Sequence, residues 1–198
     1  MRLVLGVLLV ALVIGYVLRG RLSGLSALRI RWAPLALVGL LLQYLSPSSG
    51  AWPFALLMVS FVSLAVFAAV NLGIPGFVLI LAGMSMNFLV IGLNHGMPVT
   101  QRALVVSGQQ GTLNDLMHDG GAKHHLAGPG DQLLFLGDVT PLAPPIGEIV
   151  SAGDILAYAG VGYVVVAGMR RGRRTPVPDG DRLERIPVGA PAGDAADG

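Results

Sequence analysis

Long apolar runs recur along this 198-residue chain and limit the folds open to it. A bilayer core about 30 Å thick requires roughly 20 helical residues of mainly apolar character. Four apolar runs approach that length by themselves. A fifth run, at 33–45, approaches it only when its flanking residues are included. We therefore predict an all-α integral membrane protein, a five-helix transmembrane bundle. The predicted spans are residues 3–18, 30–46, 51–70, 74–93 and 151–169.

The composition agrees with a lipid environment. Hydrophobic residues make up 54% of the chain and charged residues 12%, compared with about 25% charged residues in soluble domains. The absence of cysteine excludes disulfides, thiolate metal sites and a cysteine nucleophile. Most of the basic residues lie in arginine clusters beside predicted spans and not on one basic face, so nucleic acid is not an expected partner.

The arginine clusters predict the orientation of the chain. Basic residues concentrate in the loop at 19–32 and directly after the last predicted span. Cytoplasmic loops carry the excess of Lys and Arg, so we place this loop and the C-terminus in the cytoplasm and the N-terminus outside the membrane. Arginine outnumbers lysine 12 to 1, as in proteins from GC-rich bacterial genomes, so we expect a bacterial plasma membrane. Residues 1–172 form the predicted membrane domain. Residues 173–198, rich in Pro, Gly, Asp and Ala, are expected to be a disordered cytoplasmic tail.

Residues 94–150 form the predicted extracytoplasmic loop, and they differ in kind from the spans. They contain all the histidines and the only lysine, with Gly or Pro every few positions. A short interfacial helix is expected over 101–117, with interruptions at Gly108 and Gly111. Asn94 and His95 are expected to cap the preceding span. Candidate contacts to lipid headgroups or a partner in this loop are Asn94, His95, Lys123 and His124.

The histidines do not follow a metal-binding pattern. His124 and His125 are adjacent and diverge in any regular element, and His118 and His124 lack the i, i+4 spacing of two ligands on one helical face. Asp115, His118 and Asp119 would converge only in a helical segment. We therefore predict neither a metal nor a cofactor.

Two aspartates stand out near the last span. Asp138 and Asp154 flank a proline-rich passage, and an ionisable group at a membrane edge suggests function. A structural role for Asp154 competes with that interpretation, because Ser151-Ala-Gly-Asp154 fits a capping box and its carboxylate would meet the positive end of the helix dipole. For Asp138, a turn or cap role after Gly137 is the corresponding alternative.

Several motifs together resemble a domain-of-unknown-function family of bacterial multi-pass membrane proteins, family 5317. The resemblance covers residues 1–172. It implies a multi-pass membrane topology and no known activity. The family's first motif usually has the form Asn-Gly-Gly-x-Met-Pro-Val, and this chain is one residue shorter there and carries His95. The matching motifs are Asn94-His-Gly-Met-Pro-Val99, Lys123-His124, Leu136-Gly-Asp138-Val and Ser151-Ala-Gly-Asp154-Ile-Leu.

A weaker likeness links the C-terminal part of the chain to lipoprotein signal peptidases. By that likeness, Asp138 and Asp154 would be a catalytic pair in which one carboxyl holds a proton and the other activates water. The chain departs from those enzymes because no asparagine precedes Asp154 and no Asn-Leu-x-Asp-Arg element is found. It also has five predicted spans where those enzymes have four.

Two classes of function remain open. The first is a non-enzymatic membrane protein that packs with a membrane-protein partner or a second copy of the chain, or binds a lipid or quinone-like molecule at its extracytoplasmic face. The second is an intramembrane aspartyl hydrolase that uses Asp138 and Asp154. Transport is less favoured, because no predicted span carries a charge in its interior and no repeated pair of broken helices is visible.

Overall fold

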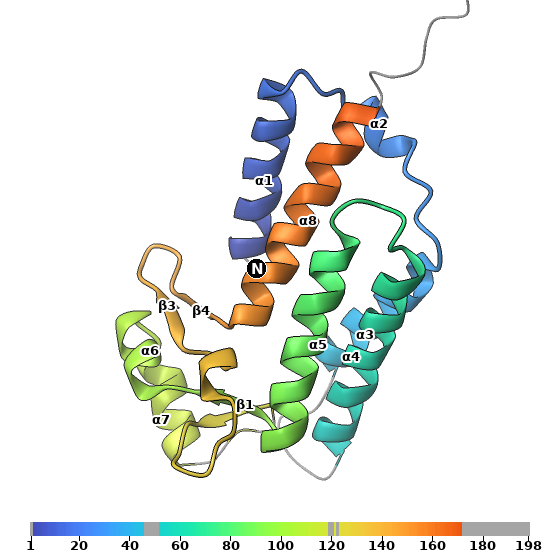
Figure 1. Ribbon diagram of the computed structural model, residues 1–198. Helices are drawn as coiled ribbons and strands as arrows, with labels where there is room; N and C mark the ends of the chain where they lie inside the picture. The colour runs from blue at the N-terminus through green and yellow to red at the C-terminus, as the bar shows by residue number, and fades with distance from the viewer. Residues whose placement is uncertain (1, 46–51, 119–120, 122, 172–198) are drawn as a thin grey trace, which may run out of the picture.

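The computed structural model describes residues 2–45, 52–118, 121 and 123–171 (Figure 1). In this part of the chain, three helices are long and apolar enough to cross a membrane. They are α4 (Trp52–Val70), α5 (Phe77–Asn94) and α8 (Ala152–Arg171). Two apolar helices are shorter: α1 (Arg2–Val17) and α3 (Ala33–Leu45). The prediction of a mostly helical membrane protein is thus supported by three helices of spanning length.

Each predicted span corresponds to one of these helices. For α1 and α3 the structure confirms a helix and does not test whether it crosses a membrane, so the five-span bundle stays a prediction. Residue 46 of the second predicted span, residue 51 of the third and the predicted tail at 173–198 lie outside the described residues.

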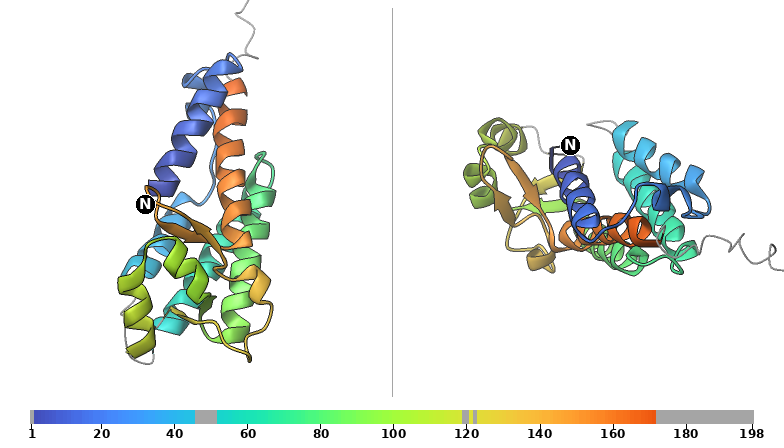
Figure 2. Two further views of the ribbon diagram at one scale, coloured as in Figure 1. Left: turned by 90° about the vertical axis from the view of Figure 1, so that its left-hand side faces the viewer. Right: turned by 90° about the horizontal axis from the view of Figure 1, so that it is seen from above.

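The helices pack in the order α3, α4, α5, α8, α1, with the short α2 (Ser23–Ser26) against the end of α8. In Figure 1, α5 and α8 run in opposite directions and overlap along part of their lengths. Viewed from above, α3 and α4 lie at one side of the molecule and α6 and α7 at the other, with α1 and α8 between them (Figure 2).

Paired glycines bring α5 and α8 into backbone contact. Gly83 on α5 lies against Gly153 on α8, and a Cβ added at Gly83 would overlap the carbonyl oxygen of Gly153. Two turns away, a Cβ added at Gly160 would lie 2.7 Å from the carbonyl oxygen of Gly76. Small residues at matching positions are a common way for membrane helices to approach closely. This close approach fixes the register of α8 against α5.

The segment between α5 and α8 is a packed unit with its own apolar core. Val99, Leu104 and Leu113 are buried, and Leu116, Leu126 and Ile149 pack against them. The predicted interruption of the 101–117 helix is confirmed at Gly108, where φ is +79°, whereas Gly111 lies inside a helix. The elements are β1 (Met97–Val99), α6 (Gln101–Val106), α7 (Gln110–His118), β2 (His124–Leu126), η1 (Leu134–Leu136), β3 (Thr140–Leu142) and β4 (Glu148–Val150).

Two small sheets organise this packed unit. β1 pairs with β2 in parallel, with Met97 opposite His124, and β3 pairs with β4 in an antiparallel hairpin. A parallel bridge joins Val99 to Asp138, so β1 has β2 on one side and Asp138 on the other. Residues far apart in the sequence therefore meet around β1.

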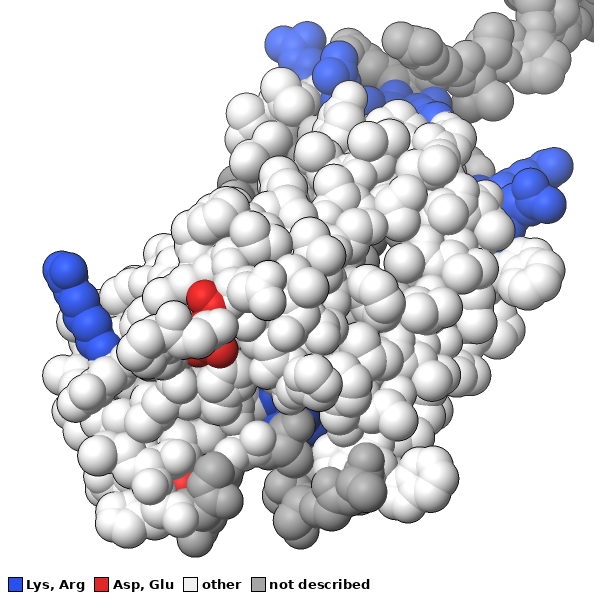
Figure 3. Space-filling view, turned by 60° about the horizontal axis from the view of Figure 1, so that its bottom comes forward, with Lys and Arg blue, Asp and Glu red and all other residues white. Residues whose placement is uncertain are grey.

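Basic side chains gather where α1 and α8 end. Arg19 and Arg21 follow α1, and Arg170 and Arg171 are the last residues of α8. In Figure 3 several basic side chains lie along the upper edge of the molecule, and most of the face in view is uncharged.

Candidate functional site

A closed hydrogen-bond network joins the start of α8 to the middle of α5. The Ser151 N–H donates to Asp154 Oδ2 (3.2 Å), and the Asp154 N–H donates to Ser151 Oγ (3.0 Å). These reciprocal bonds are those of a capping box, so the predicted cap is confirmed. Asn87 completes the network, because its Nδ2 donates to Asp154 Oδ1 (2.7 Å) and its Oδ1 accepts from the Ser151 hydroxyl (2.8 Å). Both carboxylate oxygens of Asp154 are thus acceptors.

The strand β1 positions Asp138. The Asp138 N–H donates to the Pro98 carbonyl (3.0 Å), and the Asp138 carbonyl accepts from the Thr100 N–H (3.3 Å). On the opposite edge of β1, His124 pairs with Met97. Backbone pairing on the two edges of one short strand therefore brings the side chains of Asp138 and His124 together.

The Asp138 carboxyl is buried and poorly satisfied. The residue is 8% exposed, and its Oδ1 has no hydrogen-bond partner among the described residues. Its Oδ2 lies 3.6 Å from His124 Nε2, which is too long for a hydrogen bond. Burial, and then the charge of Asp154, raise the pKa of Asp138 to about 7. The carboxyl therefore changes its charge near neutral pH.

The pKa of His124 shifts in the opposite direction. Burial lowers it most, the positive charge of Lys123 lowers it further, Asp154 acts to raise it and His125 to lower it. His124 lines two cavities, and burial is the largest cause of this shift although 49% of its side chain is accessible. An ion pair would lower the pKa of the aspartate and raise that of the histidine. Both shifts run against this, so His124 and Asp138 do not behave as an ion pair.

The two aspartates line one cavity of about 210 Å³, which we call the acidic cavity. Lys123 also lines it, and its Nζ donates to the Gln43 carbonyl on α3. The α4 wall of the cavity is apolar, whereas α5 contributes both the polar Asn87 and the apolar Ile91. Its lining is Gln43, Asn87, Lys123, His124, Asp138 and Asp154, with the apolar Leu57, Phe61, Ile91 and Met97.

A second cavity of about 210 Å³ lies under α6 and α7. His124 and Asp138 line this cavity as well as the acidic cavity. Gln109, Thr112 and Glu148 supply further polar groups to its wall. His124 and Asp138 therefore stand between the two cavities.

The structure brings together four of the predicted site residues, Asp138, Asp154, Lys123 and His124. No hydrogen bond joins the two carboxyls in the described part of the chain. Whether they act as a catalytic pair stays a prediction.

The other two predicted contacts, Asn94 and His95, serve the end of α5. Asn94 Nδ2 donates to the Val90 and Gln132 carbonyls (2.8 and 2.9 Å), and its Oδ1 accepts from the Gln132 N–H. His95 ends the helix with φ of +55° and stacks on Phe54, with the ring centroids 5.3 Å apart. The predicted cap of this helix is confirmed.

Sequence reasoning missed two contributors to the acidic cavity, Asn87 and Gln43. Asn87 interrupts the apolar span predicted at 74–93. A polar amide in such a span indicates a buried partner, although its identity is not encoded nearby. Gln43 contributes a backbone carbonyl to Lys123, for which no side-chain signal exists.

The remaining histidines make local contacts. His125 Nε2 lies 2.8 Å from Asp131 Oδ1, and His118 Nδ1 lies 2.8 Å from the Asn114 carbonyl. In the described ranges, no group of three His, Asp or Glu side chains is arranged to hold a metal ion. Asp119, part of the set considered with Asp115 and His118, lies outside those ranges.

The fold is mostly helical, and three of its helices are long and apolar enough to cross a membrane beside a polar, acidic cavity. The chain belongs to DUF5317, a family of unknown function whose model matches residues 27–166. That range contains every residue that lines the acidic cavity and leaves α1 outside. No curated protein and no solved structure matches the chain. The resemblance to family 5317 is confirmed.

Proposed function

We propose that this chain is a bacterial plasma-membrane protein that binds the polar group of a ligand in the acidic cavity and does not itself catalyse a reaction. One observation carries the proposal, the buried Asp138 Oδ1 without a hydrogen-bond partner among the described residues. Nearly all buried polar atoms in proteins have a partner, and an unsatisfied one costs about 1–3 kcal/mol. A donor group on a ligand would remove that cost.

The lining of the acidic cavity limits the kind of ligand. Asp138 offers a free acceptor, so the ligand presents a hydroxyl or amine donor. Leu57 and Phe61 on α4 and Ile91 on α5 make the opposite wall apolar. These features suit an amphipathic molecule, such as a lipid with its headgroup in the cavity, or a polar side chain on a membrane partner.

Five spans would place this cavity at the extracytoplasmic face. The arginines that follow α1 and end α8 lie at the end of α8 opposite to Asp154. Positive residues favour the cytoplasmic side, which supports an external N-terminus and an external packed unit. The 16 residues of α1 and 13 of α3 give about 24 and 20 Å of helix, so flanking residues must complete these two crossings.

Reporter fusions test this topology. A reporter fused after Arg174 is expected to be cytoplasmic, and one inserted near Gly120 extracytoplasmic, because the arginines favour the inner face. Alkaline phosphatase and a fluorescent protein, which are active on opposite sides, provide the measurement. The five-span arrangement places one span between the two positions. If both reporters are found on the same side of the membrane, that arrangement is wrong.

An intramembrane aspartyl hydrolase is the second candidate. The observation that favours this candidate is that the carboxyls of Asp138 and Asp154 line one cavity but lie in different environments. Burial raises the pKa of Asp138 to about 7, whereas the carboxylate of Asp154 accepts hydrogen bonds from Asn87 and Ser151. Two carboxyls in different environments can divide the roles of acid and base.

Three variants separate the two candidates: Asp138→Asn, Asp154→Asn and Ser151→Ala. Ligand binding predicts that Asp154→Asn and Ser151→Ala both accumulate several-fold less in the membrane, because each breaks the network with Asn87 and a loss of 1–2 kcal/mol changes abundance by about that much. Asp138→Asn should accumulate normally and fail to complement deletion of the gene.

The measurements are membrane abundance by immunoblot and complementation at matched expression. A hydrolase instead predicts that Asp154→Asn accumulates normally and is inactive, since an amide cannot share a proton or activate water. Full complementation by Asp138→Asn would overturn both proposals.

A further inference from the structure

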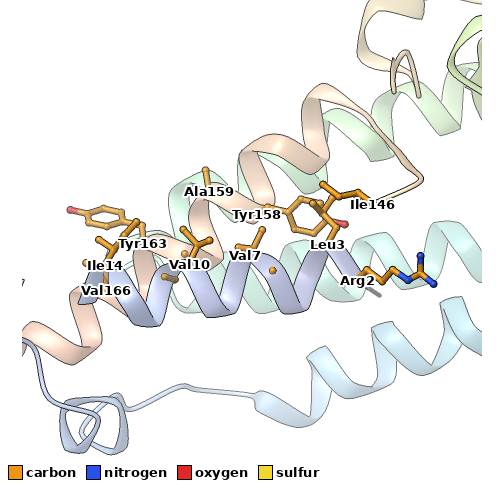
Figure 4. Close-up of a pocket in the computed structure, with 13 residues that line it drawn as sticks. Arg2, Leu3, Val7, Val10, Ile14, Ile146, Tyr158, Ala159, Tyr163 and Val166 are labelled. Carbon is orange, nitrogen blue, oxygen red and sulfur yellow. The ribbon is translucent and has the colours of Figure 1, made fainter. Parts of the chain in front are cut away.

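An apolar groove of about 630 Å³ runs between α1 and α8 (Figure 4). This volume lies in the range of pockets that hold one small molecule. It is separate from the acidic cavity, with which it shares no lining residue. Its walls include Val7, Val10 and Ile14 from α1 and Ala159, Tyr163 and Val166 from α8.

Two glycines create the space in this groove. No heavy atom lies within 4 Å of the position that a Cβ would take at Gly6. A Cβ at Gly162 would lie 3.8 Å from the Ala11 Cβ, which is an ordinary van der Waals distance. A Cβ therefore fits at both positions without a clash, and a larger side chain there would occupy space in the groove.

The length of the groove matches one leaflet of a bilayer. Its lining on α1 extends from Leu3 to Ile14, which corresponds to about 17 Å of helix. One leaflet contributes about half of a hydrocarbon core roughly 30 Å thick. The groove thus has the length and the apolar character of a site for one acyl chain.

One end of the groove is polar. Arg2 extends beyond the apolar lining there (Figure 4). Its Nη1 donates to the Pro145 carbonyl (3.3 Å) in the β3–β4 connection. Nearby, the Leu3 N–H donates to Glu148 Oε1 (3.4 Å). A guanidinium presents five N–H donors and binds phosphate well, so Arg2 has donors left for a headgroup even with Pro145 bound.

We propose that the groove between α1 and α8 binds one membrane phospholipid, with an acyl chain along the groove and the phosphate on Arg2. The charge of Arg2 selects a phosphate, and the apolar walls accept the chain. This site does not depend on the acidic cavity or on the proposed function.

Lipid binding to the purified, full-length chain in detergent tests the proposal. The probes are dioleoyl phosphatidylglycerol and dioleoylglycerol, which has the same chains and no phosphate. Native mass spectrometry should detect one phosphatidylglycerol bound per chain, at an affinity about tenfold or more above that of dioleoylglycerol. Arg2→Gln should remove this preference, whereas Arg102→Gln, on α6 and outside the groove, should keep it.

Filling the groove provides the second arm of the test. Gly6→Leu and Gly162→Leu should each lower binding of both lipids by about tenfold or more. Gly92→Leu is the matched control on α5, because its Cβ would approach only Met58 Sδ, at 3.9 Å, and it lies outside the groove. Circular dichroism shows whether Gly6→Leu and Gly162→Leu are folded. If one of them fails to fold, lipid binding by the other variant tests the proposal. Unchanged binding in a folded filled variant, or equal binding of the two lipids, would overturn the proposal.

Discussion

Gly83→Ala is expected to prevent most of the protein from accumulating folded in the membrane. The added methyl group would overlap the Gly153 carbonyl oxygen and lie 2.8 Å from the Ala157 backbone nitrogen. Both are backbone atoms of α8, so no side-chain rotation relieves the clash. The helices must separate, and separation breaks the bond between Asn87 and Asp154. Overpacking costs about 1–3 kcal/mol and an unsatisfied buried polar group a further 1–3 kcal/mol, so a loss of roughly 2–6 kcal/mol is expected before the gain in helix propensity.

Gly92→Ala on the same helix is the matched control. Its methyl group would have Met58 Sδ at 3.9 Å as its nearest neighbour. Both substitutions gain the roughly 1 kcal/mol by which Ala exceeds Gly in helix propensity, so the difference between them isolates the contact with α8. Thermal unfolding in detergent micelles and membrane abundance measure that difference. Equal stability of the two variants would show that α5 and α8 are not held in backbone contact.

The helices could be predicted because their signal is local and strong. An apolar run without charges needs no partner to identify it, and a helix that leaves no backbone group unsatisfied suits a bilayer. The cap formed by Ser151 and Asp154 could also be predicted, because its donors and acceptors lie within one helical turn. Asn94 and His95 at the end of α5 followed from the same local chemistry.

The packed unit after α5 could not be predicted in this way. Its strands have only three residues each, and β1 pairs with residues that come much later in the chain. Strands this short carry no usable alternation, and their Gly and Pro neighbours resemble an open loop. The convergence of His124 and Asp138 depends on this pairing, so it was not visible in the sequence.

The partner of Asp154 was hidden for a related reason. Asn87 lies 67 residues before it, on another helix, and reaches it only because Gly83 and Gly153 let the two helices approach. Each residue had a recognisable local feature, a polar amide in a span and a cap at a helix start. Their combination into one network depends on the packing of α5 against α8.

Asp138→Asn is expected to stabilise the protein strongly at about pH 8 and to a smaller extent at about pH 5. The pKa of Asp138 is about 7 in the fold, against an ordinary value of 3.8 for an aspartate. The folded chain therefore binds more protons than the unfolded chain between these values, so the free energy of unfolding falls as the pH rises from about 4 to 7. A shift of this size corresponds to about 4 kcal/mol. Asn has nearly the same shape and cannot ionise, so the variant avoids this loss.

Asp131→Asn is the control with the opposite expectation. Burial acts to raise the pKa of Asp131, but hydrogen bonds from the Gly128 N–H and from His125 lower it overall. Its carboxylate therefore stabilises the fold above the unfolded pKa, and that contribution is lost only when the pH falls through the lowered folded value. Asp131→Asn should accordingly destabilise the protein about equally at pH values of roughly 5 and 8.

Thermal unfolding of both variants and the wild type in detergent, from about pH 5 to pH 8, measures these effects. The melting temperature of the wild type should fall with rising pH, and that of Asp138→Asn should not. A wild type as stable at high pH as at low pH, together with a destabilised Asp138→Asn, would mean that His124 neutralises Asp138 as an ion pair. The unsatisfied acceptor on which ligand binding rests would then be absent. The expected result would instead mean that the fold keeps a destabilising carboxyl in its cavity, as proteins commonly do where a residue serves binding and not stability.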